Sequence, residues 1–134
     1  MNRSFILRAS DHPTLALCTI KRADCENLRE WKNANRFAFF HQALITPEQQ
    51  AQWFENYLTR AYDYMFIVQV DARALGCMGF RLIENHADVY YVILGDRAMG
   101  KRGWMRAAHD IYFDFALDAD EFQACQFEIV RYRR

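Results

Sequence analysis

Residues 95–103 combine three glycines with three cations, a composition that could hold a phosphate. They follow residues 87–94, a β-branched and aromatic run that predicts a strand. They precede residues 104–118, whose apolar side chains recur with helical spacing. The first N–H groups of a helix lack partners within it, glycines let a ligand approach the backbone, and cations add charge. Short glycine loops also join strands to helices where no ligand binds, so both interpretations stay open here.

A second group of polar and aromatic side chains lies in residues 31–41, which show no clean period. Trp31, Asn33, Arg36 and His41 could line a pocket for a polar substrate, because most of them offer hydrogen-bond donors. Alternatively, the aromatic residues fill space in a core. We favour the core for the phenylalanines, while for Asn33 and Arg36 the two interpretations have equal weight.

Candidates for proton transfer lie near the strand 87–94. Tyr90 and Glu84 are two of them, and His41 is a third because its ordinary pKa suits proton transfer near neutrality. For each of them we favour a surface or packing role over that of a base. Because successive strand residues point to opposite faces, we expect one of Tyr90 and Tyr91 to face the active side.

Composition excludes several classes of function. The 134 residues suffice for one domain, 1–134, and Lys plus Arg (17) equals Asp plus Glu (17), so no global field recruits nucleic acid. No apolar run reaches the length of a membrane span, and we expect no membrane partner. The four cysteines are scattered without a CxxC pair, which indicates reduced thiols in a cytoplasmic protein. With the four histidines also dispersed, we expect no metal site.

The order of elements predicts a mixed α/β fold. Thr46, Pro47 and Gln49 form a strong helix start, and that helix should bury Ala51, Phe54, Leu58 and Ala61. Gly79 lies inside a strand and could mark a bulge or a close approach. Consecutive strands with short turns are antiparallel, whereas the last strand–helix–strand unit should cross over and run parallel. The predicted strands are 14–20, 64–70, 77–83, 87–94 and 124–131, and the predicted helices are 25–32, 46–61 and 104–118, giving β-α-α-β-β-β-α-β.

This order, with particular residues, resembles the GCN5-related N-acetyltransferases, the GNAT superfamily. The resemblance covers nearly the whole chain and is strongest toward the members that acetylate ribosomal-protein N-termini and nucleotide-linked amino sugars. The segments that carry it are Trp31-Lys-Asn33 with Arg36, Ile45–Phe54, Tyr64–Val68, Leu75–Arg81, Val92–Gly95 and Gly100-Lys101.

The resemblance implies acetyl-coenzyme A (acetyl-CoA) as the acetyl donor and direct attack by a primary amine, of an amino sugar or another small molecule. A protein N-terminus is an alternative acceptor. A degenerate module that serves as an interaction domain is a third alternative. The implied pantetheine-binding residues are Val92, Ile93 and Leu94, and the implied pyrophosphate cradle is Met99, Gly100, Lys101, Arg102, Gly103, Trp104 and Met105. The implied substrate-binding residues are Trp31, Asn33, Arg36, Phe37, His41 and Arg81, and the catalytic candidates are Tyr90, Glu84 and His41.

Two features depart from the family's pattern. Arg102 and Trp104 stand where that pattern has small residues, if Gly100-Lys101 is aligned with it. The chain also stops at Arg134, about where the family continues with a further helix and strands. We therefore expect a C-terminally short GNAT domain whose last strand leaves one edge open, and such an edge can pair with a second copy in a homodimer.

Overall fold

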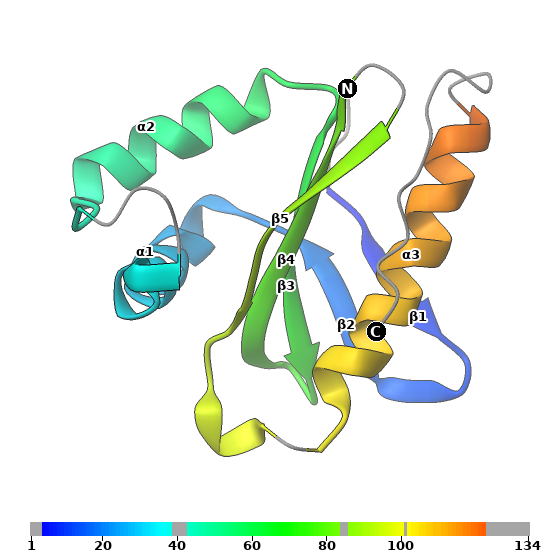
Figure 1. Ribbon diagram of the computed structural model, residues 1–134. Helices are drawn as coiled ribbons and strands as arrows, with labels where there is room; N and C mark the ends of the chain where they lie inside the picture. The colour runs from blue at the N-terminus through cyan, green and yellow to red at the C-terminus, as the bar shows by residue number, and fades with distance from the viewer. Residues whose placement is uncertain (1–3, 39–42, 84–85, 101, 123–134) are drawn as a thin grey trace.

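The computed structural model describes residues 4–38, 43–83, 86–100 and 102–122 and shows one five-stranded sheet between two layers of helices (Figure 1). The sheet is antiparallel throughout, in the order β1-β2-β3-β4-β5. The strands are β1 Ile6–Ala9, β2 His12–Thr19, β3 Asp63–Val70, β4 Arg73–Ile83 and β5 His86–Leu94. The α-helices are α1 Cys25–Ala34, α2 Pro47–Leu58 and α3 Trp104–Phe122, with 3-10 turns at Arg22–Asp24, Arg36–Ala38 and Arg97–Met99.

This arrangement confirms the mixed α/β fold with helices on both faces of the sheet. Sequence analysis did not predict β1, whose four residues are too few to show a period. The predicted strand 124–131, its parallel pairing and the homodimer that it could form lie outside the described residues.

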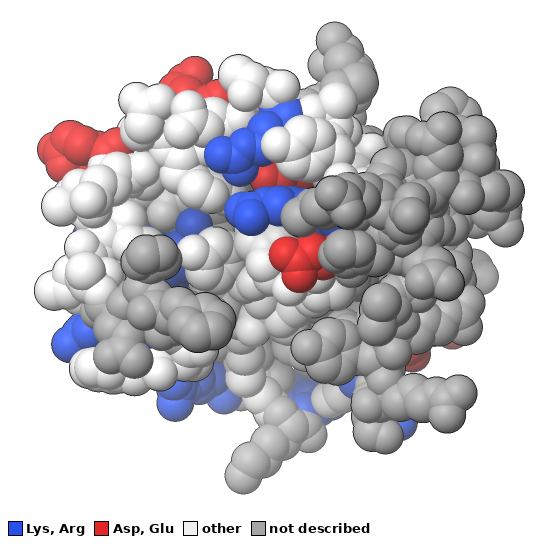
Figure 2. Space-filling model, turned by 45° about the horizontal axis from the view of Figure 1, so that its top comes forward, with Lys and Arg blue, Asp and Glu red and all other residues white. Residues whose placement is uncertain are grey.

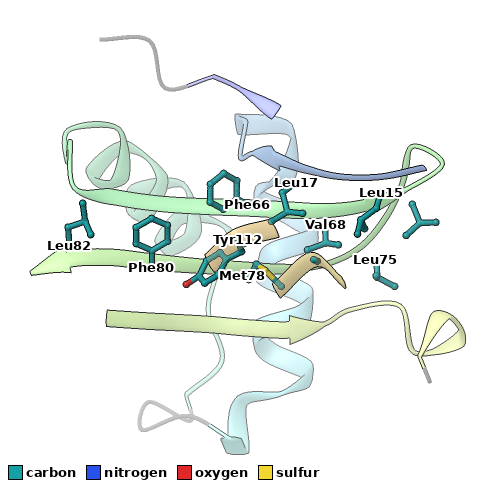
Figure 3. Packing of buried hydrophobic residues seen from close by; sticks show 11 residues of the cluster. Leu15, Leu17, Phe66, Val68, Leu75, Met78, Phe80, Leu82 and Tyr112 are labelled. Carbon is teal, nitrogen blue, oxygen red and sulfur yellow. The ribbon is translucent and has the colours of Figure 1, made fainter. Parts of the chain in front are cut away.

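One face of the sheet packs against α3 (Figure 1). The predicted apolar stripe of α3 is confirmed, because Ala108 is fully buried and Trp104, Ile111 and Phe115 pack on the same cluster. At the centre lies Tyr112, which was not predicted and is fully buried among Phe66, Met78 and Phe80 of β3 and β4 (Figure 3). The Tyr112 hydroxyl donates to the Gly79 carbonyl at 2.7 Å, so its polar atom is satisfied inside the core.

The opposite face of the sheet packs against α1 and α2. The predicted start of α2 is confirmed: the Thr46 hydroxyl accepts from the Gln49 N–H, and the Gln49 side chain accepts from the Thr46 N–H. The predicted buried face of α2 is confirmed at Phe54 but wrong at Ala51 and Leu58, which are exposed, and the helix ends at Leu58 before it reaches the exposed Ala61. The buried face is instead Gln50, Phe54 and Tyr57. Because Gln50 is polar, the pattern of apolar residues along the helix did not predict this face.

A two-residue turn, Asp71-Ala72, joins β3 to β4 with φ of 50° and 65°. Positive φ at both positions is the geometry of a type I′ hairpin, which matches the twist of the strands. An alanine pays a steric cost in this region because its Cβ crowds the following carbonyl.

Replacing Ala72 by glycine should therefore stabilise the protein by about 0.5–1 kcal/mol, the steric cost less the larger unfolded-state entropy of glycine. Urea unfolding measures the change. Ala61→Gly is the matched control, an exposed alanine outside the positive-φ residues that should gain nothing. A loss of stability in Ala72→Gly equal to that of the control would contradict the turn geometry.

Candidate functional site at the β5 bulge

The pairing of β4 with β5 is interrupted by a bulge beside Gly79, as the glycine suggested. Cys77 pairs with Ile93 and Gly79 with Tyr90, so Tyr91 and Val92 together oppose one β4 residue. Tyr91 has φ of 48°, an uncommon value for an aromatic residue. Such a bulge bends its strand and re-aims the side chains around it.

The bulge also overturns the expectation that Tyr90 and Tyr91 face opposite sides. Both pack against the cluster beneath α1 and α2, with ring centroids 5.4 Å apart. The reason is that the extra residue breaks the alternation of side chains along β5. The Tyr91 carbonyl accepts from the Cys77 thiol at 3.2 Å, and burial raises the pKa of that thiol to about 12.

A cavity of about 570 Å³ lies along β5 directly after the bulge. Among the described residues β5 is the last strand of the sheet, so its outer edge presents backbone donors and acceptors without a neighbouring strand. The structure brings the predicted Val92, Ile93, Leu94 and Gly100 together in the cavity wall. Its lining residues are Asn35, Ala38, Val92, Ile93, Leu94, Arg97 and Gly100.

The loop after β5 is held in place through its backbone. The N–H groups of Gly95 and Asp96 both donate to the Leu75 carbonyl, at 2.9 and 2.8 Å. Gly103 has φ of 77° with open space around its Cα, and it leads directly into the first turn of α3. Arg97 and Gly100 of this loop line the cavity, and Arg102 and Gly103 after them are exposed just before α3 begins.

The predicted pyrophosphate residues divide into two groups. Met99, Trp104 and Met105 pack their side chains on the α3 side of the core, so only their backbone can contribute to phosphate binding. Arg102 and Gly103 are exposed at the loop. Lys101 lies outside the described residues.

The predicted substrate residues of the α1 region are mostly occupied in packing. The Trp31 ring lies so close to Gly95 that a Cβ there would meet it at 2.2 Å. The Asn33 amide donates to the Ile45 carbonyl at 3.0 Å and accepts from the Ile45 N–H at 2.8 Å, which ties α1 to the start of α2. This geometry gives Trp31 and Asn33 structural roles.

The predicted Arg36 and Phe37 lie together after α1. The Arg36 guanidinium stands 4.4 Å from the centre of the Phe37 ring, and Phe37 is 71% exposed. These two side chains are accessible to a ligand. His41 lies outside the described residues.

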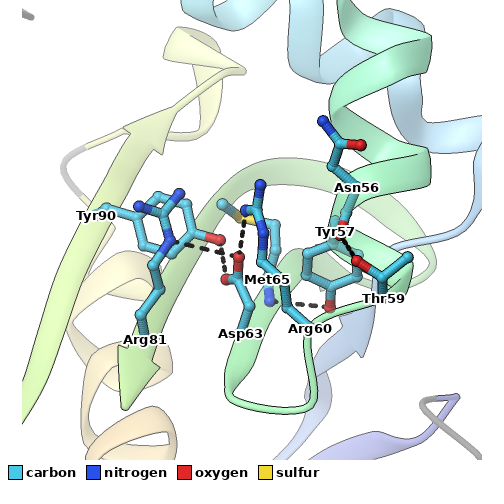
Figure 4. Close-up of polar contacts among 8 residues, drawn as sticks. All are labelled: Asn56, Tyr57, Thr59, Arg60, Asp63, Met65, Arg81 and Tyr90. Atoms are coloured by element: carbon cyan, nitrogen blue, oxygen red, sulfur yellow. Dashed lines mark hydrogen bonds and ion pairs between the residues drawn. The ribbon is translucent and has the colours of Figure 1, made fainter. Parts of the chain in front are cut away.

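Arg81 and Tyr90 belong to a polar network centred on Asp63, which is fully buried (Figure 4). The Asp63 carboxylate accepts from Arg60 at 3.1 Å, from Arg81 at 3.3 Å and from the Tyr90 hydroxyl. The Arg81 guanidinium also stacks 4.1 Å from the centre of the Tyr90 ring. Sequence analysis missed Asp63 and Arg60, although their i,i+3 spacing is that of a local ion pair.

The network fixes the protonation of Tyr90. Burial and then the Asp63 carboxylate raise its pKa far above the ordinary value, because both disfavour a phenolate. At neutral pH Tyr90 therefore keeps its proton and acts as a hydrogen-bond donor. Glu84, another predicted candidate, lies outside the described residues.

The face of the molecule shown in Figure 2 carries charges of both signs. Acidic and basic side chains are interspersed there, and no broad patch of one sign covers the described part of that face. In the part of the chain that the structure describes, no three His, Cys, Asp or Glu side chains gather in a way that could hold a metal ion. Nor is any helix among those residues both long and apolar enough to cross a membrane.

Comparison with solved structures identifies the fold as that of the GNAT N-acetyltransferases. RimL, a ribosomal L7/L12 α-N-protein acetyltransferase in complex with coenzyme A, aligns with a TM-score of 0.66 and 18% identity over 87% of this chain and 70% of that chain. An acetyltransferase from Salmonella typhimurium that modifies the N-terminal serine of L7/L12 aligns with a TM-score of 0.67 and 14% identity, over 86% of this chain and 69% of that chain. FdhC, a nucleotide-linked sugar GNAT, aligns with a TM-score of 0.62 and 20% identity, over 81% of this chain and 64% of that chain. No protein-family model and no curated sequence matches the chain.

The Asp63 network predicts a large difference between two isosteric substitutions. Asp63→Asn should destabilise the protein by about 3 kcal/mol, because it leaves two guanidiniums facing a neutral amide in a buried site. Asp71→Asn, at an exposed turn position that tolerates asparagine, should change stability by less than ~0.5 kcal/mol. Urea unfolding at pH 7 compares the two, and equal effects would show that the network contributes nothing to folding.

Proposed function

We propose that this chain is a GNAT-type N-acetyltransferase that transfers the acetyl group of acetyl-CoA to a primary amine. The observation that carries the proposal is the cavity along β5, the last strand of the sheet among the described residues, between the bulge at Tyr91 and the basic glycine loop. Among similar structures, RimL is described in complex with coenzyme A and MccE in complex with acetyl-CoA and AMP. Both share the GNAT fold at low sequence identity.

The geometry suits an extended ligand that ends in phosphates. Val92, Ile93 and Leu94 offer backbone groups to the amides of a pantetheine arm, as an added strand would. The Gly100–Gly103 loop and the start of α3 offer backbone N–H groups and positive charge to a pyrophosphate. The acetyl end would then lie near Tyr91, next to α1 and α2.

At that end, the protein would promote direct attack of the neutral amine on the thioester carbonyl. Holding the two reactants together supplies most of the acceleration that such a site needs, and backbone N–H groups at the bulge would stabilise the oxyanion. Tyr90 serves as a hydrogen-bond donor rather than as the base, because its phenol stays protonated. Glu84 and His41 remain the predicted candidates for removing a proton.

For the acceptor we propose an amino sugar or another small amine. Near the end of α1 the cavity is lined by Asn35 and Ala38, and Arg36 and the exposed Phe37 lie between them in the chain, a polar surrounding that suits a compact polar molecule. FdhC is described as a nucleotide-linked sugar GNAT, whereas RimL is described as acting on a protein N-terminus, which keeps a peptide acceptor as the alternative. A cytoplasmic location with reduced cysteines and a homodimer through the predicted last strand complete the proposal.

The proposal predicts that acetyl-CoA raises the melting temperature in a saturable way, since at 100 times Kd binding adds about 2.7 kcal/mol of stability. In Arg97→Glu combined with Arg102→Glu that rise should shrink strongly, because two cations at the phosphate end become anions. Arg8→Glu, exposed on β1 at the other edge of the sheet, is the matched control and should keep the rise.

Release of coenzyme A thiol with an amino sugar as acceptor reports the transfer itself. Turnover with glucosamine would support a small-molecule acceptor, and turnover with a peptide N-terminus alone would favour the alternative. Absence of any stabilisation by millimolar acetyl-CoA would contradict the enzyme proposal and favour the alternative of an interaction module.

A further inference from the structure

Lys32 is a buried cation without a counter-charge. Its side chain is 3% exposed, and no described carboxylate lies within salt-bridge distance of its ammonium group. Its one hydrogen bond goes to the Gln50 side-chain oxygen, at a long 3.4 Å. The rings of Trp53 and Tyr91 flank it, with centroids 4.1 and 4.5 Å from the nitrogen.

Gln50 beside it is also incompletely paired. It is 2% exposed, and its amide nitrogen has no hydrogen-bond partner. An ammonium group has three donors and a primary amide has two, so this buried spot holds far more donors than acceptors. A buried donor left unpaired costs free energy, and native proteins rarely leave one so. The missing partner is an acceptor oxygen.

Lys32 and its neighbour Tyr91 each lie close in the chain to residues that line the cavity. Asn35, which lines the cavity, lies three residues after Lys32, directly past the end of α1. Tyr91 directly precedes Val92, which lines the cavity from β5. From Tyr91, β5 continues to Leu94 and then leads into the glycine loop. Lys32 lies beside Tyr91 and therefore away from that loop, toward the end where the proposed function puts the acetyl group and the acceptor.

We propose that Lys32 and Gln50 bind an anionic oxygen of the acceptor, a carboxylate or phosphate group carried by the same molecule as the amine. This inference rests on the proposed function and narrows its substrate class. An anion would supply the acceptor oxygen that both side chains lack and the negative charge that the buried ammonium lacks. Burial lowers the pKa of Lys32 to about 8, and a bound anion would keep the ammonium charged. The flexible stem of lysine and the rotatable amide let both groups turn toward the cavity.

Three amino sugars that differ in charge test this inference: glucosamine, glucosamine 6-phosphate and glucosaminic acid. The wild-type protein should show a kcat/KM at least about tenfold higher for one of the two anionic sugars than for glucosamine, a factor that corresponds to 1.4 kcal/mol. The sugar that is preferred distinguishes phosphate from carboxylate. Lys32→Met, which keeps an unbranched stem without the charge, should lose the preference: its kcat/KM for the preferred anionic sugar should fall at least about tenfold, to the level that the same variant shows for glucosamine. Lys21→Met is the control at an exposed lysine and should keep the preference.

A binding measurement separates this inference from the proposed function. Without acetyl-CoA, the anionic sugar should stabilise the wild-type protein but not Lys32→Met in a thermal shift. Equal responses to all three sugars, or a preference that persists in Lys32→Met, would overturn the inference, as expected if a water molecule satisfies the two donors. Such a result leaves the proposed function standing wherever acetyl-CoA still binds, because that binding is measured separately.

Discussion

One extra residue in β5 sets the geometry on which the candidate site depends. Because Tyr91 and Val92 together oppose one residue of β4, the strand is locally irregular, and Val92, Ile93 and Leu94 line the cavity. The same irregularity turns Tyr90 and Tyr91 toward one side, where they meet the polar groups beneath α1 and α2. Without the bulge, β5 would be a regular strand whose side chains alternate, and the two tyrosines would lie on opposite faces.

Two polar groupings lie beside the bulge, and they differ in how well they are satisfied. The Asp63 carboxylate has three donors around it, so this network is complete and holds β3, β4 and β5 together. The Lys32 and Gln50 pair has more donors than acceptors among the described residues. Complete networks rigidify a fold, whereas an incomplete one in a buried place indicates a missing partner. This contrast is why we assign structure to Asp63 and recognition to Lys32.

Much of the fold could be predicted from the sequence, because strong local signals agree with it. The Thr46 capping box, the apolar stripe of α3 and the glycine inside β4 each predicted a feature that the structure contains. What failed depends on tertiary context. The bulge at Tyr91 cannot be read from a run of β-branched and aromatic residues, and the polar Gln50 concealed the buried face of α2. For the same reason Asp63 and Lys32 stood among ordinary charged residues until the fold buried them.

The most direct test of the account is hydrogen–deuterium exchange of the protein with and without acetyl-CoA. If the ligand lies along the open edge of β5, peptides covering Tyr91–Leu94 and the loop up to Met105 should gain protection, because their backbone groups become hydrogen-bonded or excluded from water. Peptides from β1, at the far edge of the sheet, should exchange unchanged. Protection confined to other elements, or none at saturating ligand, would contradict a coenzyme A site at the bulge.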